Sequence, residues 1–150
     1  MASNLERIGD YGKNMAKRSL VMEPSLITEQ GSNSLRRMTK DVILMMNNAL
    51  DAYVRKDVEL AEAVIIQDKD IDLHYNALFR EFLTFMMEDP KNITTCMHLH
   101  FIAKNIERVG DYVTSIAEQA IYVATGEYPS EERPKVDTTS LTKVDPESVS

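Results

Sequence analysis

The long middle of the chain is almost free of the residues that interrupt helices. Between Ser34 and Thr125 it contains one glycine, Gly110, and one proline, Pro90. The rest is rich in Leu, Ala, Met, Glu and Lys, which all have a high intrinsic preference for the helix. The sequence therefore predicts an all-α fold built from long helices.

The first part of the chain is predicted to hold one helix and a linker. The helix runs from the N-terminus to about Met22, because Pro24 disfavours the α conformation of the residue before it. The linker covers residues 23–34 and ends in Gly-Ser-Asn-Ser, each of which is a suitable cap for a following helix. Residues 1–22 are thus expected to form a helix that precedes the main bundle.

Residues 35–125 are predicted to form three helices joined by short turns. Asp57 is the expected N-cap of the second of these helices, Asp89 opens the third, and Gly126 closes it. The apolar residues recur every three or four positions, which is typical of the seam of a helical bundle. Because short turns make neighbouring helices antiparallel, we expect an up-down-up three-helix bundle.

Composition narrows the possible functions. The chain carries 17 Lys and Arg against 24 Asp and Glu, a net charge of −7, which argues against nucleic acid as a partner. The N-terminus lacks a signal-peptide pattern, so a cytoplasmic location is expected. The single cysteine, Cys96, excludes an internal disulfide and a cysteine-based zinc site. Residues 126–150 lack apolar periodicity and are predicted to be a disordered acidic tail.

One sequence of eight residues occurs twice. Residues 4–11 read NLERIGDY and residues 105–112 read NIERVGDY, with the second copy 101 positions after the first. In each copy, a Glu and an Asp four positions apart lie one turn apart on the same helix face. Such carboxylates repel each other unless a cation or a proton intervenes. The two pairs are Glu6 with Asp10, and Glu107 with Asp111.

A third acidic pair lies in the middle helix of the predicted bundle. Asp68 and Asp72 share the four-residue spacing and fall on the stripe that packing would otherwise make apolar. A charge there is costly unless it is paired or bound to a metal. An adjacent antiparallel helix can bring Glu107 and Asp111 against this pair, and four carboxylates predict a site for Fe, Mn, Mg or Ca, with Zn less favoured.

Other candidate ligands and chemistries receive less support. His100 lies two turns before Glu107 on nearly the same face, and we interpret it as a partly exposed helix histidine rather than a ligand.

The sequence contains no P-loop, HExxH or nucleophile motif. The alternative to a binding protein is a di-metal carboxylate enzyme of the ferritin-like type. That class needs Glu-x-x-His pairs, which are absent from the sequence.

These motifs resemble those of the PhoU family of phosphate-signalling regulators. Segments 6–10, 107–111 and 68–72 match the family's acidic E(D)xxxD motifs, and segment 50–57 resembles one of its turns. The resemblance implies two three-helix repeats, of which residues 1–22 are the last helix of an incomplete first repeat and residues 35–125 are the second. It also implies metal clusters on the bundle, so that the candidate ligands are Glu6, Asp10, Asp68, Asp72, Glu107 and Asp111.

The resemblance further implies a role. It predicts a non-enzymatic negative regulator of the phosphate regulon and of phosphate uptake. The expected partners are the ATPase of the phosphate ABC transporter and the phosphate-sensing histidine kinase, and contact with the membrane would occur only through these proteins. The apolar residues of the first helix need a partner surface, which either its own bundle or a second copy of the chain can supply. We expect the second: a homodimer or larger assembly in which residues 1–22 bury apolar surface across the interface.

Overall fold

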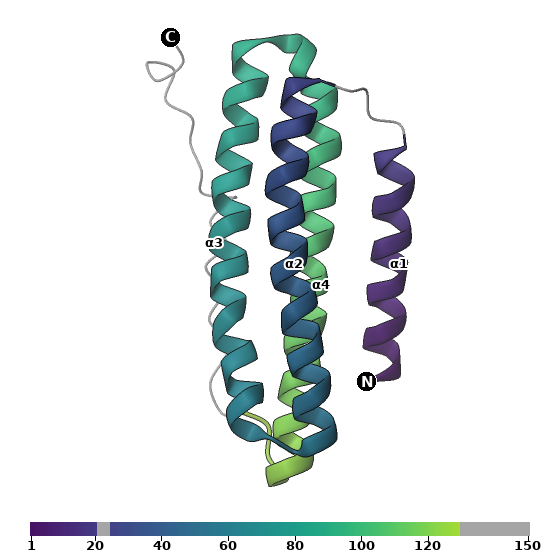
Figure 1. The fold of residues 1–150 in the computed structure, drawn as a ribbon, viewed down its shortest axis with the longest axis vertical. Coiled ribbons are helices and arrows are strands. Elements are labelled where there is room, and N and C mark those ends of the chain that lie inside the picture. The colour runs from purple at the N-terminus through teal and green to yellow at the C-terminus, as the bar shows by residue number, and fades with distance from the viewer. Residues whose placement is uncertain (21–24, 130–150) are drawn as a thin grey trace.

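The computed structural model describes residues 1–20 and 25–129 and shows that this part of the chain is all-α, as predicted. Successive α-helices run in opposite directions along the long axis of the molecule (Figure 1). Within the described ranges there is no β-strand. In chain order, the elements are α1 (Ala2–Ser19), α2 (Leu26–Arg55), α3 (Val58–Glu88), the 3₁₀ turn η1 (Pro90–Asn92) and α4 (Ile93–Thr125).

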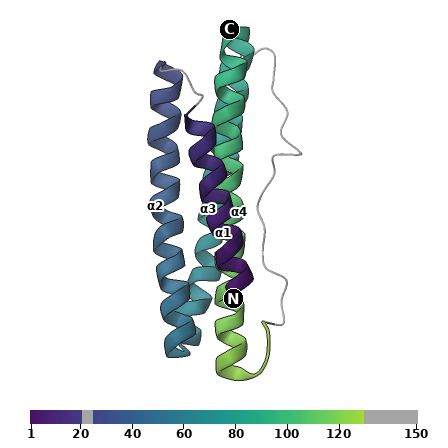
Figure 2. The same ribbon diagram turned by 90° about the vertical axis from the view of Figure 1, so that its right-hand side faces the viewer.

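The helix α4 is the centre of the packing. It packs against α1, α2 and α3, and α2 and α3 also pack against each other. The turned view shows α1 lying along α4, on the side of the molecule away from α3 (Figures 1 and 2). The predicted three-helix bundle is therefore confirmed for α2, α3 and α4, with α1 added to its outside. The largest fully buried side chains of the core include Met38, Met45, Ile71, Tyr75, Phe82, Leu99 and Ile116.

Local capping sets most helix ends where the sequence places them. The Asp57 carboxylate accepts a hydrogen bond of 3.0 Å from the backbone N–H of Leu60 at the start of α3. Gly126 closes α4 with φ = 80°, in the left-handed region that glycine adopts without strain. Asp89 caps the turn η1 through the N–H of Lys91, so α4 itself begins three residues later than its predicted proline start.

The structure differs from the predicted linker at residues 23–34. Helix α2 begins at Leu26, where Ser25 is the N-cap and its hydroxyl accepts a 3.0 Å hydrogen bond from the N–H of Thr28. Gly31 lies inside this helix and packs closely on α4: a β-carbon at this position would come within 2.6 Å of a methyl group of Leu99, so only glycine fits without a shift. Tight packing against α4 thus outweighs the low helix propensity of the Gly-Ser-Asn-Ser sequence.

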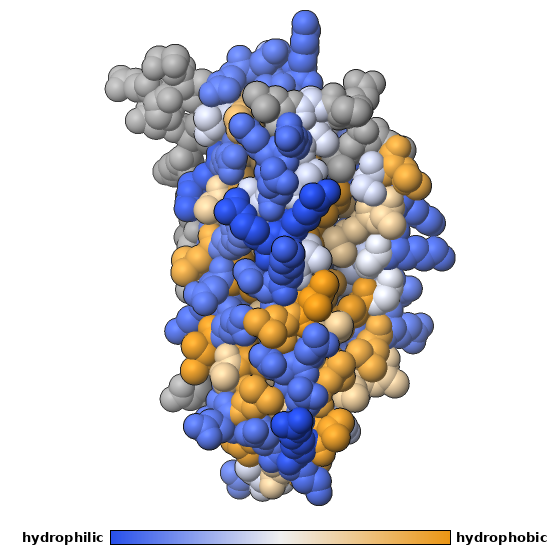
Figure 3. Space-filling model, viewed as in Figure 1, coloured by the Kyte–Doolittle hydropathy of each residue, from blue (hydrophilic) through white to orange (hydrophobic). Residues whose placement is uncertain are grey.

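The first helix packs against its own chain. Asn4 is buried, and Ile8, Tyr11 and Met15 are half-buried on the same side of α1. Apolar side chains also gather on the visible surface where α2 adjoins α1 (Figure 3). The apolar residues that were expected to need a second molecule therefore find part of their partner surface in α4 of the same chain.

The described residues include only part of the first helix and of the C-terminal tail as predicted. The predicted end of the first helix at Met22 and most of the predicted disordered tail, residues 130–150, lie outside them. In the described part of that tail, the ring of Tyr128 stacks on that of Tyr122, with centroids 4.6 Å apart. No helix in the described ranges combines the length and hydropathy that a membrane crossing requires.

Candidate metal centre

The interface between α3 and α4 holds the second octamer and the third acidic pair. Asp68 and Asp72 project from α3, and their exposed fractions are 1% and 0%. Glu107 projects from α4 and is 3% exposed, while Asp111 is half-buried. The structure therefore buries the two aspartates at seam positions, as the sequence predicts, and places a third buried carboxylate on the neighbouring helix.

Gly110 allows the two helices to approach closely at this point. A β-carbon at position 110 would lie 3.2 Å from Oδ1 of Asp68 and 3.8 Å from a methyl carbon of Ile71. A glycine in the middle of a helix costs about 1 kcal/mol relative to alanine. Here the missing side chain leaves room for a carboxylate of α3 directly against the backbone of α4.

A lysine that sequence reasoning missed lies at the edge of these carboxylates. The Nζ atom of Lys104 is 3.2 Å from Oε2 of Glu107, and it lies 5.0 Å from the centre of the Tyr75 ring on α3. Its spacing of three residues from Glu107 was the available signal, because residues three apart on a helix are neighbours. The site thus contains a protein cation as well as its carboxylates.

His100 lies beside the same part of α3. Its ring centroid is 5.1 Å from that of Phe79 and 5.9 Å from that of Tyr75, and the residue is half-buried. These contacts agree with its interpretation as a partly exposed histidine packed on an aromatic surface.

The chemistry of the α3–α4 carboxylates fits a hard divalent cation. Carboxylate oxygens are the ligands that such cations prefer, and three of the side chains are almost fully buried. Burial makes their charges costly without a counter-charge. Among the described residues, however, no three His, Cys, Asp or Glu side chains are placed to hold a metal together.

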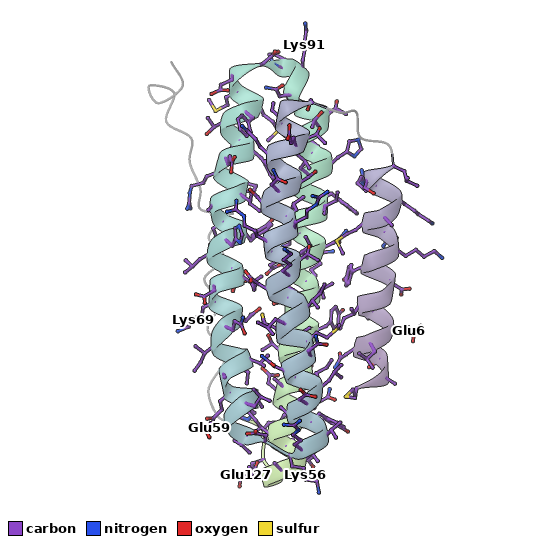
Figure 4. All side chains as sticks on the ribbon, in the orientation of Figure 1. Glu6, Lys56, Glu59, Lys69, Lys91 and Glu127 are labelled. Carbon is purple, nitrogen blue, oxygen red and sulfur yellow. The ribbon has the colours of Figure 1, made fainter. Side chains whose placement is uncertain are left out.

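The first octamer has a different environment. Glu6 and Asp10 are both exposed, and the Glu6 side chain points away from the bundle (Figure 4). A β-carbon at Gly9 would have nothing within 4 Å, in contrast to its equivalent Gly110. Within residues 1–20 and 25–129, no group of three metal-ligating side chains includes these acids. The proposed ligand role of Glu6 and Asp10 stays a prediction.

The two octamers meet through a face that the sequence analysis did not single out. The equivalent residues Tyr11 and Tyr112 contact each other, with ring centroids 5.8 Å apart. Asn4 and Asn105, the first residues of the two copies, are 8% and 3% exposed. The one available signal for these positions was that the Asn and the Tyr are the same in both copies of the octamer. One side of the repeat thus joins α1 to α4, while only the second copy has its acidic side covered.

Comparison with known proteins supports the family resemblance found in the sequence. A family model described as a PhoU domain matches residues 35–120. The chain is 47% identical over 140 residues to a protein of Rhizobium meliloti (strain 1021) named "Phosphate-specific transport system accessory protein PhoU homolog", with 93% of this chain and 59% of that protein covered.

Two further relatives carry the same name. A Caulobacter vibrioides protein (strain NA1000 / CB15N) is 44% identical over 93% of this chain and 61% of its own length. A Xylella fastidiosa protein (strain 9a5c) is 43% identical over 95% of this chain and 60% of its own length. The chain therefore spans about 60% of the length of the curated relatives that it matches.

Proposed function

Because the chain belongs to the PhoU family, we propose that it is a negative regulator of phosphate uptake and of the phosphate regulon. The match of the PhoU domain over residues 35–120, which include both acidic pairs of the α3–α4 site, is the observation that carries this proposal. The family and the name "accessory protein" of the relatives agree with the prediction of a non-enzymatic protein. The ferritin-like enzyme is accordingly not retained.

The proposed mode of action is contact between proteins. The relatives are named as accessory proteins of a phosphate-specific transport system, which supports the ATPase of the phosphate ABC transporter as one partner. The phosphate-sensing histidine kinase is the second, and the chain would link the two at the cytoplasmic side of the membrane. A bundle of long helices presents extended surfaces that suit such an adaptor.

The α3–α4 carboxylates would give this adaptor its metal site. We propose that Asp68, Asp72, Glu107 and Asp111 hold a divalent ion, with Fe, Mn, Mg and Zn as the candidates. The ion would neutralise carboxylates that the bundle buries and would tie α3 to α4. The burial of three of these four residues supports the proposal.

Deletion of the whole gene tests the regulatory role. The expected result is high expression of phosphate-starvation genes in phosphate-rich medium, because the link that signals sufficiency is lost. The measurement is the activity of a phosphate-starvation reporter in the deletion strain and in the parent. Normal repression in the deletion strain would contradict the proposed function.

We also propose that the chain forms a homo-oligomer through α1. The side of α1 that carries Glu6, Gly9 and Asp10 repeats the sequence of a covered side of α4, yet it is exposed. Leu20 at the end of α1 is also 85% exposed. Light scattering on the intact chain is expected to give at least twice the monomer mass, and on a chain that starts at Ser25 the monomer mass. A monomeric intact chain would show that packing within the chain satisfies α1.

A further inference from the structure

We propose that Lys104 is the resident cation of the α3–α4 site and that a divalent metal ion must displace it to bind. The inference rests on the metal site proposed above and names the residue that controls access to it.

The position of Lys104 is the first argument. Its Nζ atom lies 3.2 Å from Oε2 of Glu107, within the same helix. The same atom lies 5.0 Å from the ring centre of Tyr75, which follows Asp72 by three residues on α3. Residues three apart are neighbours on a helix face. The Lys104 side chain therefore reaches from α4 to α3. Its ammonium group lies beside Tyr75, one helical turn from Asp72 of the buried aspartate pair.

The burial of the carboxylates is the second argument. Glu107 is 3% exposed, and a buried carboxylate is strongly destabilising unless a counter-charge accompanies it. An ammonium group at 3.2 Å provides that counter-charge. The side chain of Lys104 is itself 34% exposed, so its flexible stem has a path to solvent.

Competition between the two cations follows from their charges. A divalent ion bound to Glu107 would lie close to the ammonium group, and like charges at such distances repel strongly in a partly buried site. In the structure, Oε2 of Glu107 is directed to Lys104. Metal binding thus includes the release of Lys104. The free energy needed for that release weakens the apparent affinity of the site for the metal.

The substitution Lys104→Met tests this inference, because methionine keeps much of the apolar stem and removes the charge. Lys69→Met is the matched control. Lys69 follows Asp68 directly on α3, but its side chain points away from the bundle (Figure 4), and its loss changes the net charge equally. Chelator-treated proteins that comprise residues 1–150 are titrated with Mn²⁺ by calorimetry. We expect Mn²⁺ to bind the Lys104 variant about tenfold more tightly than the original chain, and the Lys69 variant with unchanged affinity.

A second measurement follows Lys104 itself. Brief treatment of the original chain with acetic anhydride, followed by mass spectrometry, reports how accessible each lysine is. Saturating Mn²⁺ is expected to raise the acetylation of Lys104 several-fold and to leave that of Lys69 unchanged. The melting temperature adds a third comparison: without metal the Lys104 variant is expected to melt below the original chain, and Mn²⁺ is expected to remove that difference.

The outcomes separate the inference from the site on which it rests. If the original chain binds Mn²⁺ and the Lys104 variant binds it equally or more weakly, the displacement is refuted while the metal site stands. If Mn²⁺ binds neither the original chain nor the Lys104 variant, both are refuted. Binding by the Lys104 variant alone would support the inference, because the resident cation would then exclude the ion completely.

Discussion

Replacing Glu107 and Asp111 together with alanine is expected to abolish stoichiometric metal binding. The double substitution removes both α4 carboxylates from the α3–α4 site, and Asp68 and Asp72 alone leave a divalent ion with too few protein ligands. The measurement is elemental analysis of the purified protein after reconstitution with Mn²⁺ and removal of the excess. The original chain is expected to retain metal, and the variant none.

The repeat supplies a matched control for this experiment. Glu6→Ala with Asp10→Ala makes the same two changes in the first octamer, where both residues are exposed. This variant is expected to keep the metal of the α3–α4 site. Unchanged metal content in the Glu107 and Asp111 variant would refute the site, and loss of metal only from the Glu6 and Asp10 variant would place the ion on α1.

The substitution Gly110→Ala is expected to destabilise the protein by up to about 2 kcal/mol, the packing cost less the gain in propensity, whereas Gly9→Ala is expected to stabilise it. Both changes gain about 1 kcal/mol of helix propensity. At position 110 the new β-carbon would lie 3.2 Å from Oδ1 of Asp68, which is 1% exposed and has little room to move. Overpacking of this kind typically costs about 1–3 kcal/mol. At position 9 nothing lies within 4 Å, so the gain in propensity is not offset.

Urea denaturation of the two variants measures this difference. Because both glycines occupy the same place in the same octamer, the propensity gain cancels, and the gap between the two free energies of unfolding reports the packing cost at position 110. We expect that gap to be about 1–3 kcal/mol. Equal stabilisation of the two variants would show that α3 and α4 do not approach as closely at Gly110 as the structure describes.

The comparison of the two octamers shows where sequence reasoning reaches its limit. The same i, i+4 spacing of Glu and Asp occurs in both, so local rules predict equal sites. In the structure, Glu107 is 3% exposed and shares an interface with Asp68, whereas Glu6 is exposed and points away from the bundle. The difference lies in the neighbouring helix, which the spacing of residues within one helix does not describe.

The sequence by itself determined the features that depend on neighbours along the chain: the helical class, the caps at Asp57 and Gly126, and the acidic pairs on single helix faces. Hydrogen bonds and side-chain spacing within a few residues are sufficient for these. Only the tertiary structure decided the passage of α2 through Gly31 against Leu99, the burial of one octamer's acids, and the reach of Lys104 to Tyr75. Each of these depends on a contact or a covering helix far away in sequence, and the free energy of such packing outweighs local preference.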